Sequence, residues 1–414
     1  MAAANSLVGK KNALLSKPKH MEPSLIEAGA RLFVTTFLGR YISAGCLTLL
    51  EEDGTVLTFE GDKTKCSLKV VLKVHNPQFY WKIMTRADLG LADAYIDGDI
   101  SFADENEGLL NLFLLLIASR DSKSSISKLD KRRGWWTPLI FTAAIGSASY
   151  CFKHLLRQNS LTQARRNISR HYELARIDEK HEILDIGCGW GSFAIEVVNQ
   201  TGCKYTGITL SKEQLKLAEQ KVKDAGLQDR IKLLLCDYRQ LPNTYKYDRI
   251  ISCEMIEHVG HEYMEEFFRC CDSLLAEDGL FVLQFISIPD QRYDQHRRSA
   301  DFMKEYIFPG GCLPSLNSVI SAMANASRFC VEHAENIGIH YYQTLRYWRK
   351  NFMDNRRKIL ALGFDEKFMR TWEYYFDYCA SGFKSRTLGD YQVVFSRPGN
   401  FTALNKPYQS FHQE

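Results

Sequence analysis

The sequence has no apolar run long enough to cross a membrane. Its most hydrophobic stretch, 109–118, is interrupted by Asn111 and reaches about half of the roughly 20 residues that a spanning helix needs. The first 20 residues contain several lysines but no apolar segment, which argues against a secretory signal peptide. We therefore expect a protein that is soluble or bound to a membrane only at its surface.

A strong excess of charge is also missing. The chain has 53 Lys and Arg residues against 49 Asp and Glu residues, a net charge of +4, which argues against a dedicated nucleic-acid-binding protein. The twelve cysteines are scattered and form no C-x-x-C pair, so they predict neither a disulfide framework nor a metal site. This pattern indicates a reducing compartment, and we expect a cytoplasmic protein.

What the 414 residues do contain is an ordinary globular composition, with 45% hydrophobic and 25% charged residues. In the first third, strand and helix patterns are mixed: strands are predicted at 46–50, 55–59 and 67–74, and helices at 77–84 and 108–118. We predict a flexible lead-in at 1–24, an α+β domain at 25–120, a Ser/Lys-rich linker region at 121–160 and a second domain at 161–414.

Strands and helices alternate in the second domain. Strands are predicted at 182–186, 204–208, 231–235, 247–252 and 280–287, with helices at 192–200, 212–225 and 263–275. Such alternation predicts an α/β fold with a parallel sheet covered on both faces. Two later strand candidates, 329–339 and 391–396, bracket a helical, aromatic-rich insertion at 341–380.

The first strand of this domain runs into a glycine loop that opens a helix. The loop contains Asp185, Gly187, Cys188, Gly189 and Gly191. Glycines there let the backbone turn tightly and approach a nucleoside-sized ligand. A dinucleotide fold would need G-x-G-x-x-G and an acid at the end of the second strand, and neither is present. The spacing therefore favours S-adenosylmethionine (SAM) over NAD, with these five residues as cofactor contacts.

Polar residues follow the next strands of the predicted sheet. Asp237 and Tyr238 come after the third strand, where an adenine-binding pair commonly lies, although this pair taken alone would favour a polar loop. Glu254 and Glu257 follow the fourth strand, at the edge where open α/β sheets bind ligands. The alternative for both glutamates is a charge that complements a helix dipole. Their position favours a functional role for at least one of them.

Together these motifs resemble the cyclopropane fatty acid synthases and their mycolic acid relatives. The similarity runs in order from about 167 to 398 and is carried by 187–191, 209–214, 255–260, 307–311, 340–341 and 379–383, with a weaker match at 87–95. The amino-acid sequence of these motifs is most similar to the C-terminal part of the plant-type enzymes. In those enzymes a flavin amine-oxidase-like domain usually precedes this region. The resemblance implies a Rossmann-like SAM-dependent methyltransferase fold with a final antiparallel strand.

The resemblance also implies a reaction. Family members add a methylene group from SAM across the cis double bond of an unsaturated phospholipid acyl chain. By resemblance the base is a bound bicarbonate, held by Glu257, Tyr341, Gln284 and the backbone of Ile286, with Gln284 standing where the family has histidine. Cys379 matches a cysteine that the family treats as an active-site residue. Further cofactor contacts fall on Thr209, Leu210 and Gln214.

One departure leaves other functions open. After Tyr172 the family has a block with a Tyr-Ser-Cys motif that touches SAM and bicarbonate, and this chain lacks it. A catalytically impaired pseudo-enzyme that binds lipid is therefore one alternative. A small-molecule N-methyltransferase of similar architecture is another.

The expected partners follow from the implied substrate. An acyl chain in a bilayer must be reached from the surface, so we expect peripheral membrane contact through the basic segment 123–133 with Trp135 and Trp136 beside it. The alternative without a function is that this segment is a solvated loop. A second copy of the chain, in a homodimer, is a further candidate partner.

Overall fold

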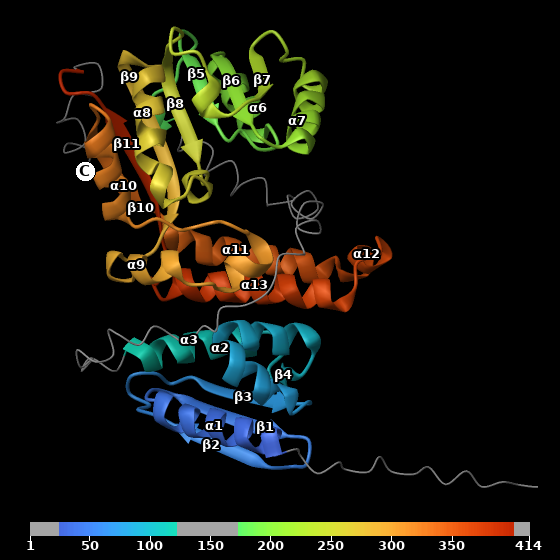
Figure 1. Ribbon diagram of the computed structural model, residues 1–414. Helices are drawn as coiled ribbons and strands as arrows, with labels where there is room; N and C mark the ends of the chain where they lie inside the picture. Colours follow the sequence, from blue (N-terminus) through green and yellow to red (C-terminus); the bar gives the residue numbers. More distant parts are fainter. Residues whose placement is uncertain (1–24, 122–172, 401–414) are drawn as a thin grey trace, which may run out of the picture.

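The computed structural model describes residues 25–121 and 173–400, which form two sheets and the helices around them (Figure 1). The smaller sheet has the strand order β2-β1-β3-β4. Its strands are β1 (Cys46–Glu51), β2 (Val56–Glu60), β3 (Lys69–Val74) and β4 (Ile100–Phe102). β1 and β2 are an antiparallel hairpin, as the turn between them predicts. The third predicted strand is confirmed as β3, which pairs parallel to β1.

Three helices pack with this small sheet: α1 (Leu25–Tyr41), α2 (Gln78–Asp97) and α3 (Gly108–Asp121). The sequence predicts α3 well and only the first part of α2, which continues past a kink at Ala87 with φ of 50°. It misses α1 because the apolar residues of that helix are spread around it. Leu32 and Phe33 are exposed, for example, whereas Val34 is buried.

The larger sheet has seven strands in the order β10-β11-β9-β8-β5-β6-β7. They are β5 (Glu182–Ile186), β6 (Lys204–Thr209), β7 (Ile231–Leu235), β8 (Tyr247–Cys253), β9 (Leu275–Ser287), β10 (Cys330–Asn336) and β11 (Gly389–Ser396). β5 to β9 run parallel to one another, and β11 is antiparallel to both β9 and β10. The predicted parallel sheet with a final antiparallel strand is thus confirmed.

Helices cover both faces of this sheet, because successive residues of a strand point to opposite sides. Ile183 packs into a core with residues of α6 (Ser192–Thr201) and α7 (Lys212–Asp224). Its neighbour Leu184 packs into a separate core with residues of α8 (Met264–Leu274) and α10 (Leu316–Ala326). Two shorter elements, α9 (Asp290–Arg298) and the π-helix η5 (Met303–Ile307), lie between β9 and α10 in the chain.

The chain between β10 and β11 forms a helical layer of α11 (Gly338–Asp354), α12 (Arg356–Ala361) and α13 (Glu366–Lys384). Figure 1 shows α11 and α13 between the large sheet and the N-terminal elements. α13 contacts α2 and α3. Its Tyr374 is fully buried among aromatic rings, with 5.1 Å between its ring centroid and that of Phe113 and 4.5 Å to that of Phe302. This aromatic-rich layer therefore joins the two sheets.

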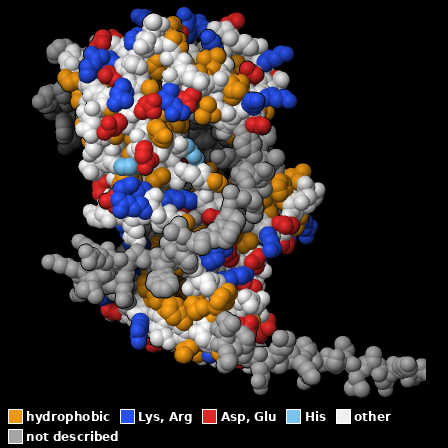
Figure 2. All heavy atoms as spheres, viewed as in Figure 1, with side chains coloured by type: hydrophobic (Ala, Val, Ile, Leu, Met, Phe, Trp, Pro, Cys, Tyr) orange, Lys and Arg blue, Asp and Glu red, His pale blue; other side chains and the backbone are white. Residues whose placement is uncertain are grey.

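Within the described ranges, no helix has the length and hydrophobicity to cross a bilayer. Lys and Arg side chains are interspersed with Asp and Glu over the upper part of the face drawn in Figure 2, in keeping with the small net charge. The basic segment 123–133 and its two tryptophans lie outside the described residues.

Candidate active site

The predicted site residues converge on one edge of the large sheet. β5, β6, β7, β8 and β9 run in the same direction, so their carboxyl ends share that edge. The strand order then divides the edge in two. The glycine loop and the segments after β6 and β7 lie on one side, whereas the segment after β8 and the end of β9 lie on the other.

The glycine loop has a shape that only glycine adopts easily. Gly187, Gly189 and Gly191 have φ angles of 97°, 54° and 75°, in the left-handed region that L side chains avoid. The backbone N–H groups of Gly187 and Cys188 both donate to the carbonyl of Ile208, each at 3.0 Å. A Cβ on Gly191 would lie 2.8 Å from the Cβ of Ala218. The loop is therefore held close to β6 and α7.

Asp185 is buried at the end of β5, where the Tyr205 hydroxyl donates a hydrogen bond to its carboxylate. Burial raises the pKa of Asp185 to about 7, although the bond from Tyr205 opposes the rise. In this structure the carboxylate braces β5 against β6. Its contact with a cofactor stays a prediction.

The residues after β6 form a small hydrogen-bonded turn. The Thr209 hydroxyl donates to Oε1 of Gln214 at 3.0 Å, and Ser211 caps α7 by accepting from the N–H of Gln214. Leu210 projects from this turn with 73% of its surface exposed. These residues are adjacent, as the sequence predicts, and Leu210 is an exposed apolar side chain beside the glycine loop.

After β7, Asp237 is paired with Arg239 at 2.7 Å, and hydrogen bonds from that residue lower the pKa of Asp237. The Tyr238 ring packs edge-on against Phe267, with 5.3 Å between centroids. Asp237 and Tyr238 thus lie at the same sheet edge, on the side of the glycine loop. A cofactor contact for either residue remains a prediction.

The other half is a cluster of acids and amides from four elements. Gln284 in β9 donates from Nε2 to Oε1 of Glu254 at 2.9 Å and to Oδ2 of Asp390 in β11 at 3.2 Å. The Tyr341 hydroxyl in α11 donates to the same Oε1 of Glu254. The N–H of Ile286 donates to Oε1 of Glu257 at 2.7 Å. All four residues of the predicted base site therefore come together.

These carboxyl groups do not all ionise at neutral pH. Burial, followed by repulsion from Glu254, raises the pKa of Glu257 to about 8. Burial and the two glutamates raise the pKa of Asp390 well above its usual range, and burial raises that of Glu254. Like charges in a poorly hydrated site favour shared protons, so the cluster is equipped to accept and release protons.

Two members of the cluster were not predicted. Asp390 is fully buried and its Oδ1 has no hydrogen-bond partner within the described ranges. Gln392, two residues later, donates from Nε2 to Oε1 of Gln284 at 2.8 Å. Polar residues at alternate positions of an otherwise apolar buried strand were the available signal, because such side chains need a polar neighbour.

The cluster lies next to the glycine loop and to an apolar wall. A Cβ on Gly187 would lie 3.1 Å from Cγ of Met255, the residue after Glu254. On the other side, the Tyr341 ring stacks on Phe383 at 5.0 Å. The acids thus lie between the loop and the aromatic residues of α11 and α13.

Cys379 is part of this wall and not of the polar cluster. Its Sγ lies 3.7 Å from Sδ of Met303, and no hydrogen bond within the described part of the chain links it to Glu254 or Glu257. Burial raises the pKa of its thiol, so the group stays protonated. The position suits packing against an apolar ligand better than nucleophilic attack.

The donors in the cluster do not fit a bound bicarbonate. The Ile286 N–H is used by Glu257, and both Tyr341 and Gln284 donate to Glu254. An added anion would have to displace Glu254 from the donors of Gln284 and Tyr341. The glycine loop, in contrast, keeps the left-handed backbone and the close packing on its neighbours that let such loops approach a nucleoside ligand.

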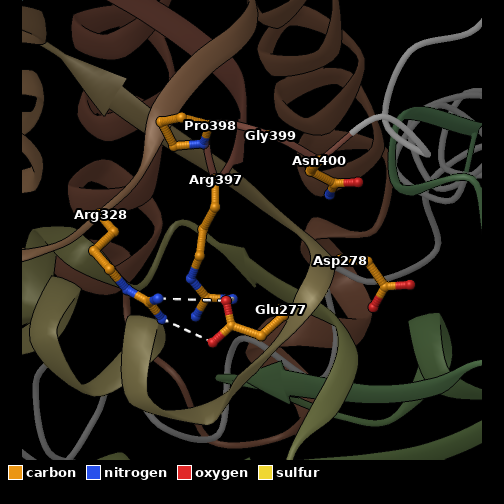
Figure 3. Close-up of a pocket in the computed structure, with 7 residues that line it drawn as sticks. All are labelled: Glu277, Asp278, Arg328, Arg397, Pro398, Gly399 and Asn400. Atoms are coloured by element: carbon orange, nitrogen blue, oxygen red, sulfur yellow. Dashed lines mark hydrogen bonds and ion pairs between the residues drawn. The ribbon is translucent and has the colours of Figure 1, made fainter.

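Figure 3 shows a surface pocket lined by Glu277, Asp278, Arg328, Arg397, Pro398, Gly399 and Asn400. Glu277 lies near the start of β9, seven residues before Gln284, which corresponds to roughly 20 Å along a strand. Arg328 pairs with Glu277 at 3.1 Å. This pocket lies at the opposite end of the strand from the acid cluster and plays no part in the site.

The model of the mycolic acid cyclopropane synthetase family matches residues 147–393. The chain belongs to this family. Its members are SAM-dependent methyltransferases that act on lipids, so the choice of SAM over NAD and the predicted enzyme class are confirmed.

Sequence identity to individual relatives agrees with this family assignment. The chain is 37% identical to the tuberculostearic acid methyltransferase UfaA1 of Mycobacterium tuberculosis over 57% of this chain and 54% of that protein. It is 29% identical to the cyclopropane-fatty-acyl-phospholipid synthase of Escherichia coli, over 79% of this chain and 87% of that protein. The alignment thus spans about half the length of the first relative.

Solved structures confirm the fold class. The mycolic acid cyclopropane synthase CmaA1, in complex with SAH and CTAB, is 28% identical with a TM-score of 0.51 over 56% of this chain and 83% of that chain. A coclaurine N-methyltransferase has a TM-score of 0.54 over 76% of this chain and 100% of that chain. At 18% identity the latter shows a shared fold and nothing about substrate.

Proposed function

We propose that this protein adds a methylene group from SAM across the cis double bond of an unsaturated phospholipid acyl chain, forming a cyclopropane. The observation that carries the proposal is the position of the acid cluster: Met255, which follows Glu254 in the chain, lies beside Gly187 of the glycine loop. A proton acceptor beside a methyl donor is what ring closure requires, because a transferred methyl must lose one proton.

The protein's own residues supply the other requirements. SAM supplies, when bound, an electrophilic sulfonium methyl. Attack by the alkene leaves a cation on the acyl chain, which water would trap and which electron-rich rings stabilise. Tyr341 and Phe383 place such rings beside the acids, and Ile286 and Met303 belong to the same apolar cluster. These apolar and aromatic surroundings suit a hydrocarbon chain better than a soluble amine.

Expression in a host rich in monounsaturated phospholipid tests the proposal. We expect acyl chains heavier by one CH2, with the upfield proton NMR signals of a cyclopropane, which an exomethylene isomer lacks. Glu257→Gln should lose most of this product, whereas Glu262→Gln, at an exposed position, should retain it. A folded, SAM-binding protein that makes no ring would refute the proposal.

Two alternatives have their own readouts. Calorimetry that shows micromolar SAM binding would count against a pseudo-enzyme. Transfer of the methyl to soluble amines, with none to lipid vesicles, would indicate an N-methyltransferase.

The proposed substrate also calls for peripheral membrane contact. We expect the protein to float with anionic vesicles at low salt and to be released at high salt. Alanine in place of Lys128, Lys131, Arg132 and Arg133 should reduce flotation, and equal flotation would exclude this segment as the anchor.

Sedimentation velocity of the protein would test for a homodimer.

A further inference from the structure

We propose that the carboxylate of Glu254 occupies the position that the family resemblance assigns to bicarbonate, and that Glu254 is the base that removes the proton before ring closure. This inference rests on the proposed function for its chemical step. Its claim about which group occupies the position does not depend on turnover.

The first argument is the hydrogen bonding of Glu254. The two side chains matched to bicarbonate ligands, Gln284 and Tyr341, both donate to one atom, Oε1 of Glu254. These are the donors that would otherwise hold a free anion. The bond from Gln284 measures 2.9 Å, an ordinary length for a neutral donor to a carboxylate. A carboxylate of the chain itself thus satisfies the donors.

The orientation of Gln284 supports the same assignment. Its Oε1 accepts a hydrogen bond of 2.8 Å from Gln392, so its NH2 group faces Glu254 and Asp390. A neutral amide in this position can hold one carboxylate in place. It carries no positive charge with which to hold a second anion beside three acids.

The backbone supports it as well. Glu254 has a φ of 50°, in a region that residues other than glycine rarely adopt, while its N–H donates to the carbonyl of Gln284 at 2.8 Å. Such strained residues persist where the surroundings hold them and are concentrated at functional sites. Here the surroundings are β9 and α11, which hold the carboxylate between Gln284 and Tyr341.

Accessibility distinguishes Glu254 from its two acidic neighbours. Glu257 and Asp390 are 6% and 0% exposed, whereas Glu254 is only partly buried. Oε2 of Glu254 receives neither the bond from Gln284 nor that from Tyr341, and Met255 next to it packs at the glycine loop. Of the three acids, Glu254 is thus the least buried, and it directly precedes the residue that lies at the glycine loop.

The chemical step balances with the carboxylate as base. When an alkene carbon bonds to the sulfonium methyl, the carbon–sulfur bond breaks and its electron pair remains on sulfur. A C–H bond of the new methyl group then breaks, its proton bonds to Oε2 of Glu254, and its electron pair forms the last carbon–carbon bond of the ring. Loss of the proton to water restores the carboxylate.

The test combines bicarbonate binding with turnover in the full-length protein. In a buffer depleted of CO2, we expect wild-type turnover to be unchanged, and NMR with 13C-labelled bicarbonate should show no binding. Glu254→Ala, which vacates the position, should lose at least about 100-fold of ring formation and should bind bicarbonate. Added bicarbonate or formate should restore part of its activity.

Glu254→Gln is the matched variant, because it keeps the volume and the acceptor oxygen but cannot take a proton. It should be inactive and should not be rescued, while Glu262→Gln should behave like wild type. SAM calorimetry on each variant confirms that it is folded. Wild-type binding of bicarbonate, a bicarbonate requirement of the wild type, or full activity of Glu254→Gln would overturn the proposal.

Failure of the proposed function would look different. The wild type would then bind SAM and make no ring product, and bicarbonate binding would still decide which group occupies the position. Binding by Glu254→Ala alone would support occupancy by Glu254. Binding by the wild type, or by neither protein, would overturn it.

Discussion

The hydroxyl of Tyr95 in α2 donates a hydrogen bond of 2.8 Å to Glu373 in α13, 278 positions later in the sequence. Arg370 of the same helix donates to the backbone carbonyl of Tyr95 at 2.7 Å. The N-terminal elements therefore brace the helix that carries Cys379 and Phe383 beside the acid cluster. This contact gives the small N-terminal sheet a role in holding the site.

Removal of this contact should lower stability. We expect Tyr95→Phe to reduce the free energy of unfolding by about 1–3 kcal/mol, because a buried hydrogen bond to a carboxylate is lost. Denaturant titration measures the change. Tyr347→Phe, at a tyrosine with 51% of its surface exposed, should change stability by less than about 0.5 kcal/mol. Equal effects of the two variants would contradict the bracing role.

The glycine loop should not tolerate a side chain at Gly191. Alanine there would be strained at a φ of 75° and would place its Cβ 2.8 Å from that of Ala218. We expect Gly191→Ala to weaken SAM binding at least about 10-fold by calorimetry. Gly226→Ala is the matched control, since Gly226 has a φ of 69° and open space around it. It should cost about 1 kcal/mol of stability and leave SAM affinity unchanged.

Stability should fall as pH rises, because Glu257 has a pKa of about 8 in the folded protein against an ordinary value of 4.5. Between these values the folded state keeps a proton that the unfolded chain has released. The free energy of unfolding should therefore decrease by up to about 1.4 kcal/mol per pH unit for this group.

Glu257→Gln should flatten this pH dependence without removing it, because the pKa values of Glu254 and Asp390 are also raised. Thermal or denaturant unfolding from pH 5 to 8 measures the slope. Exposed Glu262→Gln should leave it unchanged. A slope in Glu257→Gln as steep as in the wild type would show that this carboxyl does not titrate as described.

Tyr341 should contribute to turnover through its hydroxyl. Tyr341→Phe keeps the stacking on Phe383 but removes the donor to Glu254. A hydrogen bond to a charged group contributes about 1.5–3 kcal/mol, so kcat should fall roughly 10- to 100-fold. SAM affinity should not change. Tyr342→Phe is the control, since the Tyr342 hydroxyl accepts a bond from Lys384 at 3.3 Å and, within the described residues, makes no hydrogen bond to Glu254. A similar loss in both variants would argue against a specific role for Tyr341.

Local sequence patterns were enough for most elements of the large sheet. β5 has the predicted bounds, and the other strands agree within a few residues except β9, which begins at Leu275, five residues earlier than predicted. Its early part includes exposed Glu277 and Asp278, which do not look like a buried strand. β4 was missed because three residues carry no measurable period.

The sequence by itself determined the glycine loop, the succession of strands and helices along the chain and the residues at the strand ends, since turn geometry and alternation act over a few neighbouring residues. Only the tertiary structure decided which polar groups meet. Asp390 reaches Gln284 because β11 inserts beside β9, and Tyr341 reaches Glu254 because α11 crosses the same edge. A hydrogen bond depends on distance and angle between groups far apart in the chain, and these follow from packing, which no local pattern encodes.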